Sequence, residues 1–301
     1  MTESNSQVPW SDEQWDRVKR AIQEEANRAR VAATFLQLFG PLPASADFVR
    51  KEEIKIDDRI TIADTDTIKL PTLQVKVYLR GAQMTDPELT SALAMFKRAA
   101  NLLARLEDAL IFNGQPNVST PPAGGPAIWE VLGGQPSNGL LAAGAPGVEV
   151  PADGEKLVRA VSKAIGDLEG NGQFGPFAVA LGQELFLAAQ TPNDKSLVLP
   201  QDRIIPFLGG GGSLVRSSTL DPKKGVVVAL GGAPVELVIA TDLSLNFLQV
   251  TPEPMFVFRV YEKMALRIKE SDAIVALVPP AAPAAGPVVP QAGGRRNDKS
   301  D

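Results

Sequence analysis

The chain has 301 residues, a length that corresponds to about two domains or to one large domain with insertions. Its 30 Lys and Arg residues are outnumbered by 35 Asp and Glu residues, and the net charge of −5 does not favour a protein that coats nucleic acid. The absence of Cys and His excludes disulfides, thiolate metal sites, a Cys nucleophile and the usual general base. Any enzyme chemistry would have to use carboxylate, lysine or tyrosine groups, or a bound cofactor.

The sequence predicts neither a signal peptide nor a membrane span. Residues 1–9 are polar, and the longest apolar stretches, residues 226–230 and 273–278, are far shorter than the ~20 residues that a spanning helix needs. We therefore expect a cytoplasmic protein that contacts neither membranes nor nucleic acid.

A first helix is predicted to begin after Ser11. Ser11 and Gln14 have the spacing of a capping box, and Trp10 and Trp15 stand at the two positions of a hydrophobic staple. Apolar residues then recur at helical spacing and give the helix one apolar face, namely Trp15, Val18, Ile22, Ala26, Ala29 and Ala33. The pair Gly40-Pro41 predicts the end of this region.

Residues 47–80 alternate between apolar and polar side chains with the period of two that is typical of strands. Turn-forming residues at 64–67 separate the two halves of this pattern. We interpret the segment as a long two-stranded arm. An isolated hairpin is marginally stable in water, so the arm is expected to need a partner surface, and another copy of the chain is one candidate.

The remaining elements are predicted from periodicity and stop signals. Helices are expected at residues 87–112, 153–168 and 183–190. Strands are expected at residues 177–181, 225–230, 235–240 and 256–268, and a short element near 128–132. The segment between residues 190 and 225 is interpreted as a long loop, and the Pro-rich residues 279–301 predict a disordered tail.

No short motif predicts a catalytic site. The glycines at 209–212 lack the Gly-Lys-Ser/Thr of a phosphate-binding loop and are interpreted as a loop. Glu107 and Asp108 are adjacent on a helix and point to different sides, which favours structural pairing with an Arg over a shared acid–base site. Asp64 and Asp66 lack the Gly and distal Glu of a calcium loop. We expect no catalytic residue, no metal and no cofactor.

Several stretches, taken in order, resemble the encapsulins, also called the linocin or bacteriocin-like family. The most specific is Leu-Glu-Asp-Ala-Leu-Ile-Phe-Asn-Gly at 106–114, which is close to the family's Glu-Asp-x-x-Ile-Phe-x-Gly helix end. The others lie at residues 11–15, 35–41, 70–71, 175–181, 242–245, 267–269 and 272–274. The resemblance runs from about residue 10 to residue 277 and implies an α+β fold of the HK97 phage-capsid type.

The resemblance also implies a division of the chain. The expected parts are an N-terminal helical segment that faces the lumen (1–46), an E-loop arm that intertwines with neighbouring subunits (47–80), an axial A-domain (132–234) and the tail (279–301). The peripheral P-domain, with the long helix as its spine, is expected to comprise residues 81–131 and 235–278.

By the same resemblance, the protein is a non-enzymatic shell subunit that self-assembles into an icosahedral compartment around cargo enzymes, often peroxidases or iron-storage proteins. Such cargo binds through a mostly apolar C-terminal peptide, between the N-terminal helix and the P-domain. The positions that match this site are Ile22, Ala29, Phe35, Leu38, Leu245 and Phe247. Ordinary core packing is the alternative interpretation of each position. Asn193, Asp194 and Lys195 are expected in a pore loop at the five-fold axis.

Two other functions remain open at this point. A major capsid protein of a phage or prophage would share the fold, although such capsids commonly carry an additional N-terminal scaffolding segment, whereas here a helix is expected by residue 11. A hydrolase or a bacteriocin is the alternative from another class, and a chain without His and Cys has little chemistry for it.

Overall fold

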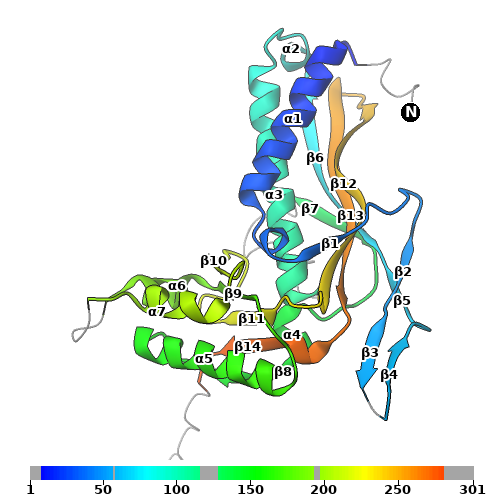
Figure 1. Ribbon diagram of the computed structural model, residues 1–301. Coiled ribbons are helices and arrows are strands. Elements are labelled where there is room, and N and C mark those ends of the chain that lie inside the picture. Colours follow the sequence, from blue (N-terminus) through cyan, green and yellow to red (C-terminus); the bar gives the residue numbers. More distant parts are fainter. Residues whose placement is uncertain (1–7, 57, 116–127, 193–196, 281–301) are drawn as a thin grey trace, which may run out of the picture.

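The computed structural model describes residues 8–56, 58–115, 128–192 and 197–280, which contain two five-stranded sheets, a projecting arm and covering helices. Figure 1 shows an elongated part that holds α1, α3 and the longest strands, and a second part that holds α5, α6 and α7. No helix of these residues is both long enough and apolar enough to cross a lipid bilayer.

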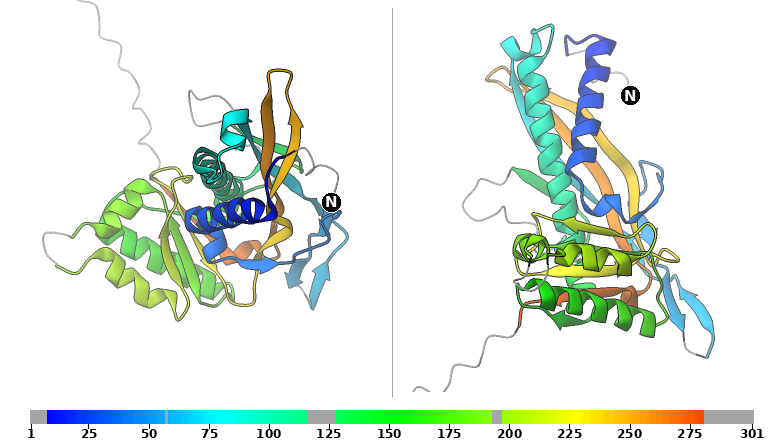
Figure 2. Two further views of the ribbon diagram at one scale, coloured as in Figure 1. Left: turned by 90° about the horizontal axis from the view of Figure 1, so that it is seen from above. Right: turned by 60° about the vertical axis from the view of Figure 1, so that its left-hand side comes forward.

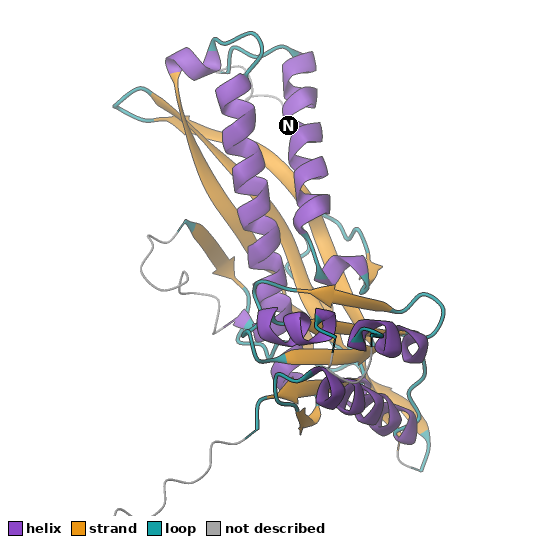
Figure 3. Cartoon of the chain, turned by 90° about the vertical axis from the view of Figure 1, so that its left-hand side faces the viewer, coloured by secondary structure: helices purple, strands orange, loops and turns teal. Residues whose placement is uncertain are grey.

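In the elongated part, two helices pack on one face of a sheet with strand order β1-β12-β13-β6-β7 (Figure 3). The strands are β1 (Gln37–Phe39), β6 (Pro71–Arg80), β7 (Trp129–Gly133), β12 (Val235–Val250) and β13 (Met255–Ile268). The helices are α1 (Asp12–Ala29), α3 (Thr90–Asn113) and the short connector α2 (Gly81–Met84). The main hydrophobic core lies between these helices and the sheet.

The start of α1 confirms the predicted capping box and staple. The Ser11 hydroxyl accepts the Gln14 backbone N–H, and the Gln14 side chain accepts the Ser11 backbone N–H. The rings of Trp10 and Trp15 are 5.0 Å apart, and both are buried. The Trp10 indole N–H also donates to the Met84 carbonyl oxygen at 3.1 Å, which attaches the helix start to α2.

The second part is a sheet of order β10-β9-β11-β14-β8 whose strands β9 and β11 are buried on both faces. Its strands are β8 (Ala145–Glu149), β9 (Phe177–Leu181), β10 (Ser213–Arg216), β11 (Gly225–Ala229) and β14 (Ile274–Val278). Its helices are α4 (Leu140–Ala143), α5 (Gly154–Gly170), α6 (Gln183–Gln190) and α7 (Pro200–Ile204). Alternate residues of β11 point to opposite faces, so Val226 and Val228 join the main core, while Val227 packs with α5 and α6.

The arm differs from its prediction. It consists of β2 (Phe48–Arg50), β3 (Glu53–Ile56), β4 (Ile60–Ala63) and β5 (Thr67–Lys69). β3 pairs with β4 and β2 pairs with β5, so residues 64–66 separate β4 from β5 and are not the turn between two halves of one long hairpin. The last predicted stretch, β6, pairs with β13 and β7 in the main sheet instead of with the arm. Burial of its apolar side chains under α3 explains this placement, because the sheet offers a core that an arm lacks.

Other predictions need smaller corrections. The first helix ends at Ala29, well before Gly40, and is followed by the 3₁₀ turn η2 (Ala32–Thr34) and β1. The predicted loop between α6 and β11 contains α7 and β10, and residues 274–278 form the strand β14 of the second sheet. Residues 281–301 of the expected tail lie outside the described residues.

Candidate assembly and cargo-binding surfaces

The β3–β4 hairpin has one apolar face. Its ladder pairs Ile54 with Ile62 and Ile56 with Ile60, so these four side chains lie on the same side of the ribbon and form what we call the isoleucine face. Ile56, Ile60 and Ile62 are 68%, 75% and 62% exposed. The hairpin projects from the rest of the chain (Figure 2). Contiguous apolar surface of this kind marks a site of interaction with another molecule.

Arg267 of β13 lies where the arm meets the sheet, and its side chain is only 2% exposed. Its guanidinium donates two hydrogen bonds to one oxygen of Glu236 on β12, and it lies 3.0 Å from the Glu52 carboxylate of the arm. Lys269 lies 2.7 Å from the other oxygen of Glu236. The guanidinium carbon is also 4.1 Å from the centre of the Phe39 ring on β1. We call Arg267, Glu236, Lys269 and Glu52 the Arg267 cluster.

The Arg267 cluster is balanced in charge, with two cations and two carboxylates. Burial raises the pKa of Glu236, but the hydrogen bonds from Lys269 and Arg267 outweigh burial, so its pKa lies below the ordinary value. Glu236 therefore stays ionised at neutral pH and retains both of its cationic partners.

Glu52 stands at a bend in the arm. Arg50 pairs with Thr67 and Glu53 pairs with Ala63, which leaves residues 51–52 opposite 64–66 and breaks the ladder. The φ angle of Glu52 is +54°, in the left-handed region that costs a non-glycine residue about 1–2 kcal/mol. The contact of its carboxylate with Arg267 helps to offset this cost.

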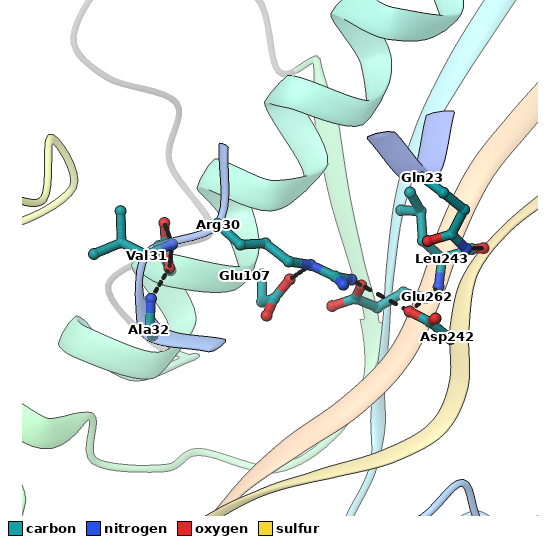
Figure 4. A network of polar contacts seen from close by, with 9 residues as sticks. Gln23, Arg30, Val31, Ala32, Glu107, Asp242, Leu243 and Glu262 are labelled. Carbon is teal, nitrogen blue, oxygen red and sulfur yellow. Dashed lines mark hydrogen bonds and ion pairs between the residues drawn. The ribbon is translucent and has the colours of Figure 1, made fainter. Parts of the chain in front are cut away.

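A second, largely buried arginine joins α1 to the core. Arg30 follows directly after α1, and its side chain, 11% exposed, contacts Glu107 of α3 at 2.6 Å, Glu262 of β13 at 2.5 Å and Asp242 of β12 at 3.5 Å (Figure 4). With Asp108, these residues form what we call the Arg30 cluster. The contact between Glu107 and Arg30 confirms the predicted structural pairing.

The Arg30 cluster holds more carboxylates than cations. Burial raises the pKa of Glu107 to about 7 and keeps the pKa of Glu262 well above its ordinary value, in spite of the nearby Arg30. Like charges disfavour ionisation, so the charge of Glu107 further raises the pKa of Glu262, and the charge of Asp108 further raises that of Glu107. The cluster therefore binds protons that the unfolded chain would release.

Asp108 explains where α1 ends. Its carboxylate accepts hydrogen bonds from the backbone N–H groups of Val31 at 3.1 Å and Ala32 at 2.8 Å. These two N–H groups therefore bond to a side chain of α3 and do not continue the helix. Burial raises the pKa of Asp108 to about 6, while these two hydrogen bonds act in the opposite direction. Asp108 thus has a different partner from its neighbour Glu107, as expected for adjacent residues of a helix.

The predicted cargo-contacting residues have unequal access to solvent. Ile22, Leu245 and Phe247 are buried within the main core. Ala29 and Phe35 are half-buried, and Phe35 packs against that core. Leu38, on the edge strand β1, is 55% exposed. The structure thus presents part of this set at the surface. The predicted pore residues Asn193, Asp194 and Lys195 lie outside the described residues.

No local sequence pattern had marked Arg30, Arg267 or most of their partners as a site. A signal existed for Glu262, which interrupts the alternating series of buried residues Phe258, Val260, Met264 and Leu266. A charged residue in such a series indicates a buried ion pair, because an unpaired buried charge is costly. No comparable pattern marks Arg267, because the arm that covers it is placed by the tertiary structure.

Comparisons with known proteins agree with this fold. The structure is similar to that of a virus-like particle from Pyrococcus furiosus, with a TM-score of 0.66 at 18% identity over 88% of this chain and 99% of that chain. It is also similar to the capsid of the Myoviridae phage XM1, with a TM-score of 0.57 at 16% identity over 82% of this chain and 90% of that chain. These matches confirm the predicted α+β fold of the HK97 capsid type, which compartments and phage capsids share.

The sequence comparisons separate these possibilities. A family model described as "Encapsulating protein for peroxidase" matches residues 2–121 and 127–265. The chain is also 27% identical, over 292 residues, to the type 1 encapsulin shell protein EncA of Myxococcus xanthus (strain DK1622), a match that covers 91% of this chain and 95% of that protein. Because the family model covers most of the chain, the protein belongs to the encapsulin family.

Proposed function

We propose that this chain is the subunit of a closed icosahedral compartment in the cytoplasm and that its arm fastens neighbouring subunits together. The observation that carries the proposal is the isoleucine face, because a ribbon with four aligned isoleucines leaves apolar surface in water until a second copy covers it. On this proposal the elongated part acts as the P-domain, the second part as the A-domain, and the shell itself has no catalytic activity.

Paired variants of the arm test assembly. Ile60→Asp combined with Ile62→Asp places two charges on the isoleucine face, whereas Thr61→Asp places one charge on the opposite face of the same strand. Size-exclusion chromatography and electron microscopy should show large closed particles for the wild type and for Thr61→Asp, and small species with unchanged circular dichroism for the double variant. Wild-type protein that remains monomeric, or a double variant that assembles normally, contradicts the proposal.

We further propose that the compartment encloses an enzyme, such as a peroxidase or an iron-storage protein, through an apolar peptide at the C-terminus of that enzyme. Leu38, which is exposed on the edge strand β1, and the half-buried Phe35 supply the accessible contacts, with Ala29 beside them. Ile22, Leu245 and Phe247 support this surface from within the core. Asn193, Asp194 and Lys195 remain our proposed pore residues.

Cargo binding can be measured with fluorescent proteins fused to the C-terminal segments of peroxidases and iron-storage proteins from the source organism. Leu38→Asp and Phe35→Asp should reduce the co-purifying fluorescence while shells remain intact in electron micrographs. Gln37→Asp, an equal change on the adjacent residue of β1, is the matched control. If both apolar variants retain their cargo, this site is wrong. Shells that contain packaged nucleic acid would instead support a phage capsid.

A further inference from the structure

We propose that Arg267 is the residue that sets the direction of the assembly arm, by holding Glu52 at the bend between β2 and β3. The inference rests on the proposed role of the arm in assembly and adds what controls its geometry. Arg267 contacts Glu236 of β12, Phe39 of β1 and Glu52 of the arm, so it connects two strands of the sheet to the bend. It also donates a hydrogen bond to the Arg50 carbonyl oxygen at 3.3 Å.

The arm is attached differently on the two sides of this bend. Before it, Val49 and Ile68 pack against a small cluster on the outer face of the sheet, formed by Leu70, Val238, Ala240 and Ala265. Beyond it, the hairpin is tied to the sheet by a backbone hydrogen bond from Ile54 N–H to the Lys269 carbonyl oxygen at 2.9 Å. The bend is therefore the point at which a packed ribbon becomes a projecting one.

The backbone conformation of Glu52 indicates that its side chain is held in place. We call the contact between the Glu52 carboxylate and the Arg267 guanidinium the clamp. Glycine is the residue that adopts a positive φ freely, and this chain has a glutamate there with a φ of +54°. A strained conformation persists where its surroundings determine it, and the contact between the Glu52 carboxylate and the buried Arg267 is such a determinant. A planar guanidinium held by Glu236 also limits the directions from which Glu52 can approach.

This clamp matters for a closed shell because every arm has to reach its neighbour at a compatible angle. An arm that swings freely about residues 51–52 would meet neighbouring subunits at several angles, and shells of more than one curvature would form. Glu52 is 38% exposed at its side chain, so salt should weaken the clamp more than it weakens the buried pair between Arg267 and Glu236.

The arm angle can be measured by pulsed electron paramagnetic resonance between spin labels. The chain has no cysteine, so Thr61→Cys in the arm and Lys97→Cys in α3 provide unique labelling sites. Glu52→Gly removes the carboxylate but permits the positive φ, while Glu53→Gln removes the adjacent carboxylate, which pairs with Lys51 at the surface. We expect a narrow distance distribution for the labelled parent and for Glu53→Gln, and a broadened or shifted one for Glu52→Gly.

A second readout is the diameter of the particles in electron micrographs, recorded without labels. Glu52→Gly should lose the single size class that the wild type and Glu53→Gln retain, although its thermal unfolding curve stays close to theirs. Unchanged distances and unchanged diameters for Glu52→Gly, or equal changes for Glu53→Gln, overturn the inference. If the wild type fails to assemble, the proposed function fails, yet the intramolecular distance still tests the clamp. Labelled shells are diluted with unlabelled subunits so that the two labels report one chain.

Discussion

Arg267, which is buried, and Arg30, which is largely buried, perform similar structural work in opposite electrostatic settings. Arg267 and Lys269 face two carboxylates, whereas Arg30 faces three and has a fourth, Asp108, close by. The difference shows that the number of ion pairs does not by itself indicate whether a buried cluster keeps its charges. The balanced cluster keeps its charges, and the cluster with excess carboxylates has to bind protons to remain buried.

The two clusters therefore respond to pH in opposite directions. Glu107 and Asp108 have raised pKa values of about 7 and about 6, so the folded chain holds their protons more tightly than the unfolded chain, and stability falls as pH rises through this range. Glu236 has a lowered pKa, so its contribution is present at neutral pH and is lost as pH falls towards and below its ordinary titration range.

The largest effect is expected from Arg30→Met. This change leaves Glu107 and Glu262 buried without their cation, and breaking a buried ion pair costs about 3–5 kcal/mol of unfolding free energy. Guanidinium titrations followed by tryptophan fluorescence at two pH values provide the measurement. The loss should be larger at alkaline pH than in mild acid, where the carboxyl groups take up protons. An equal loss at both pH values would contradict the inference that the surplus carboxylates of the Arg30 cluster bind protons.

Glu236→Gln should have the next largest effect. It removes the acceptor charge for Arg267 and Lys269, and hydrogen bonds to charged groups are worth about 1.5–3 kcal/mol. The loss in unfolding free energy should shrink as pH falls, because the wild-type carboxylate then becomes protonated. A loss that grows in acid would show that Glu236 does not act as a buried anion.

Glu107→Gln tests the proton-binding cluster directly. The amide mimics the protonated carboxyl group, so the fall in stability between about pH 5 and about pH 8 should become shallower, by on the order of 1 kcal/mol. The measurement is the unfolding free energy across this pH range. Glu130→Gln, at a surface pair with Lys76, serves as the control and should leave the slope over this range unchanged. If the unfolding free energy of Glu107→Gln depends on pH as steeply as that of the wild type, Glu107 is not the group that binds the proton.

The smallest effect is expected from Asp242→Asn. Asp242 is 56% exposed and lies 3.5 Å from Arg30, so its loss should cost less than about 1 kcal/mol. Thermal unfolding at low and high salt provides the measurement. A loss comparable to that of Arg30→Met would mean that the exposed rim, rather than the buried pair, holds α1 in place.

Local signals predicted many elements well. The capping box at Ser11, the periodicity of α3 and the boundaries of β9 and α6 agree with the structure because each depends on neighbours within a few residues. The arm was predicted less well. Its period-two pattern resumes after the turn-forming residues 64–67 and continues, with a shift of one residue, into β6. Alternation alone does not say which strand a segment pairs with.

The candidate site was likewise predicted only as far as local patterns reach. The four isoleucines of the isoleucine face were visible as an alternating series, but their exposure depends on what the rest of the chain covers. The six proposed cargo positions came from the resemblance, and the structure divides them between core and surface because solvent access depends on packing of distant elements.

By itself the sequence determined the local elements, the apolar series and the membership of the encapsulin family, since these depend on residue order along the chain. The tertiary structure decided the partners of the charged residues. Arg30 and Glu262 are 232 positions apart, and Arg267 meets Glu236 because β12 and β13 are neighbours in the sheet. Charge pairing depends on distance in space and on burial, which a pattern of neighbours does not contain.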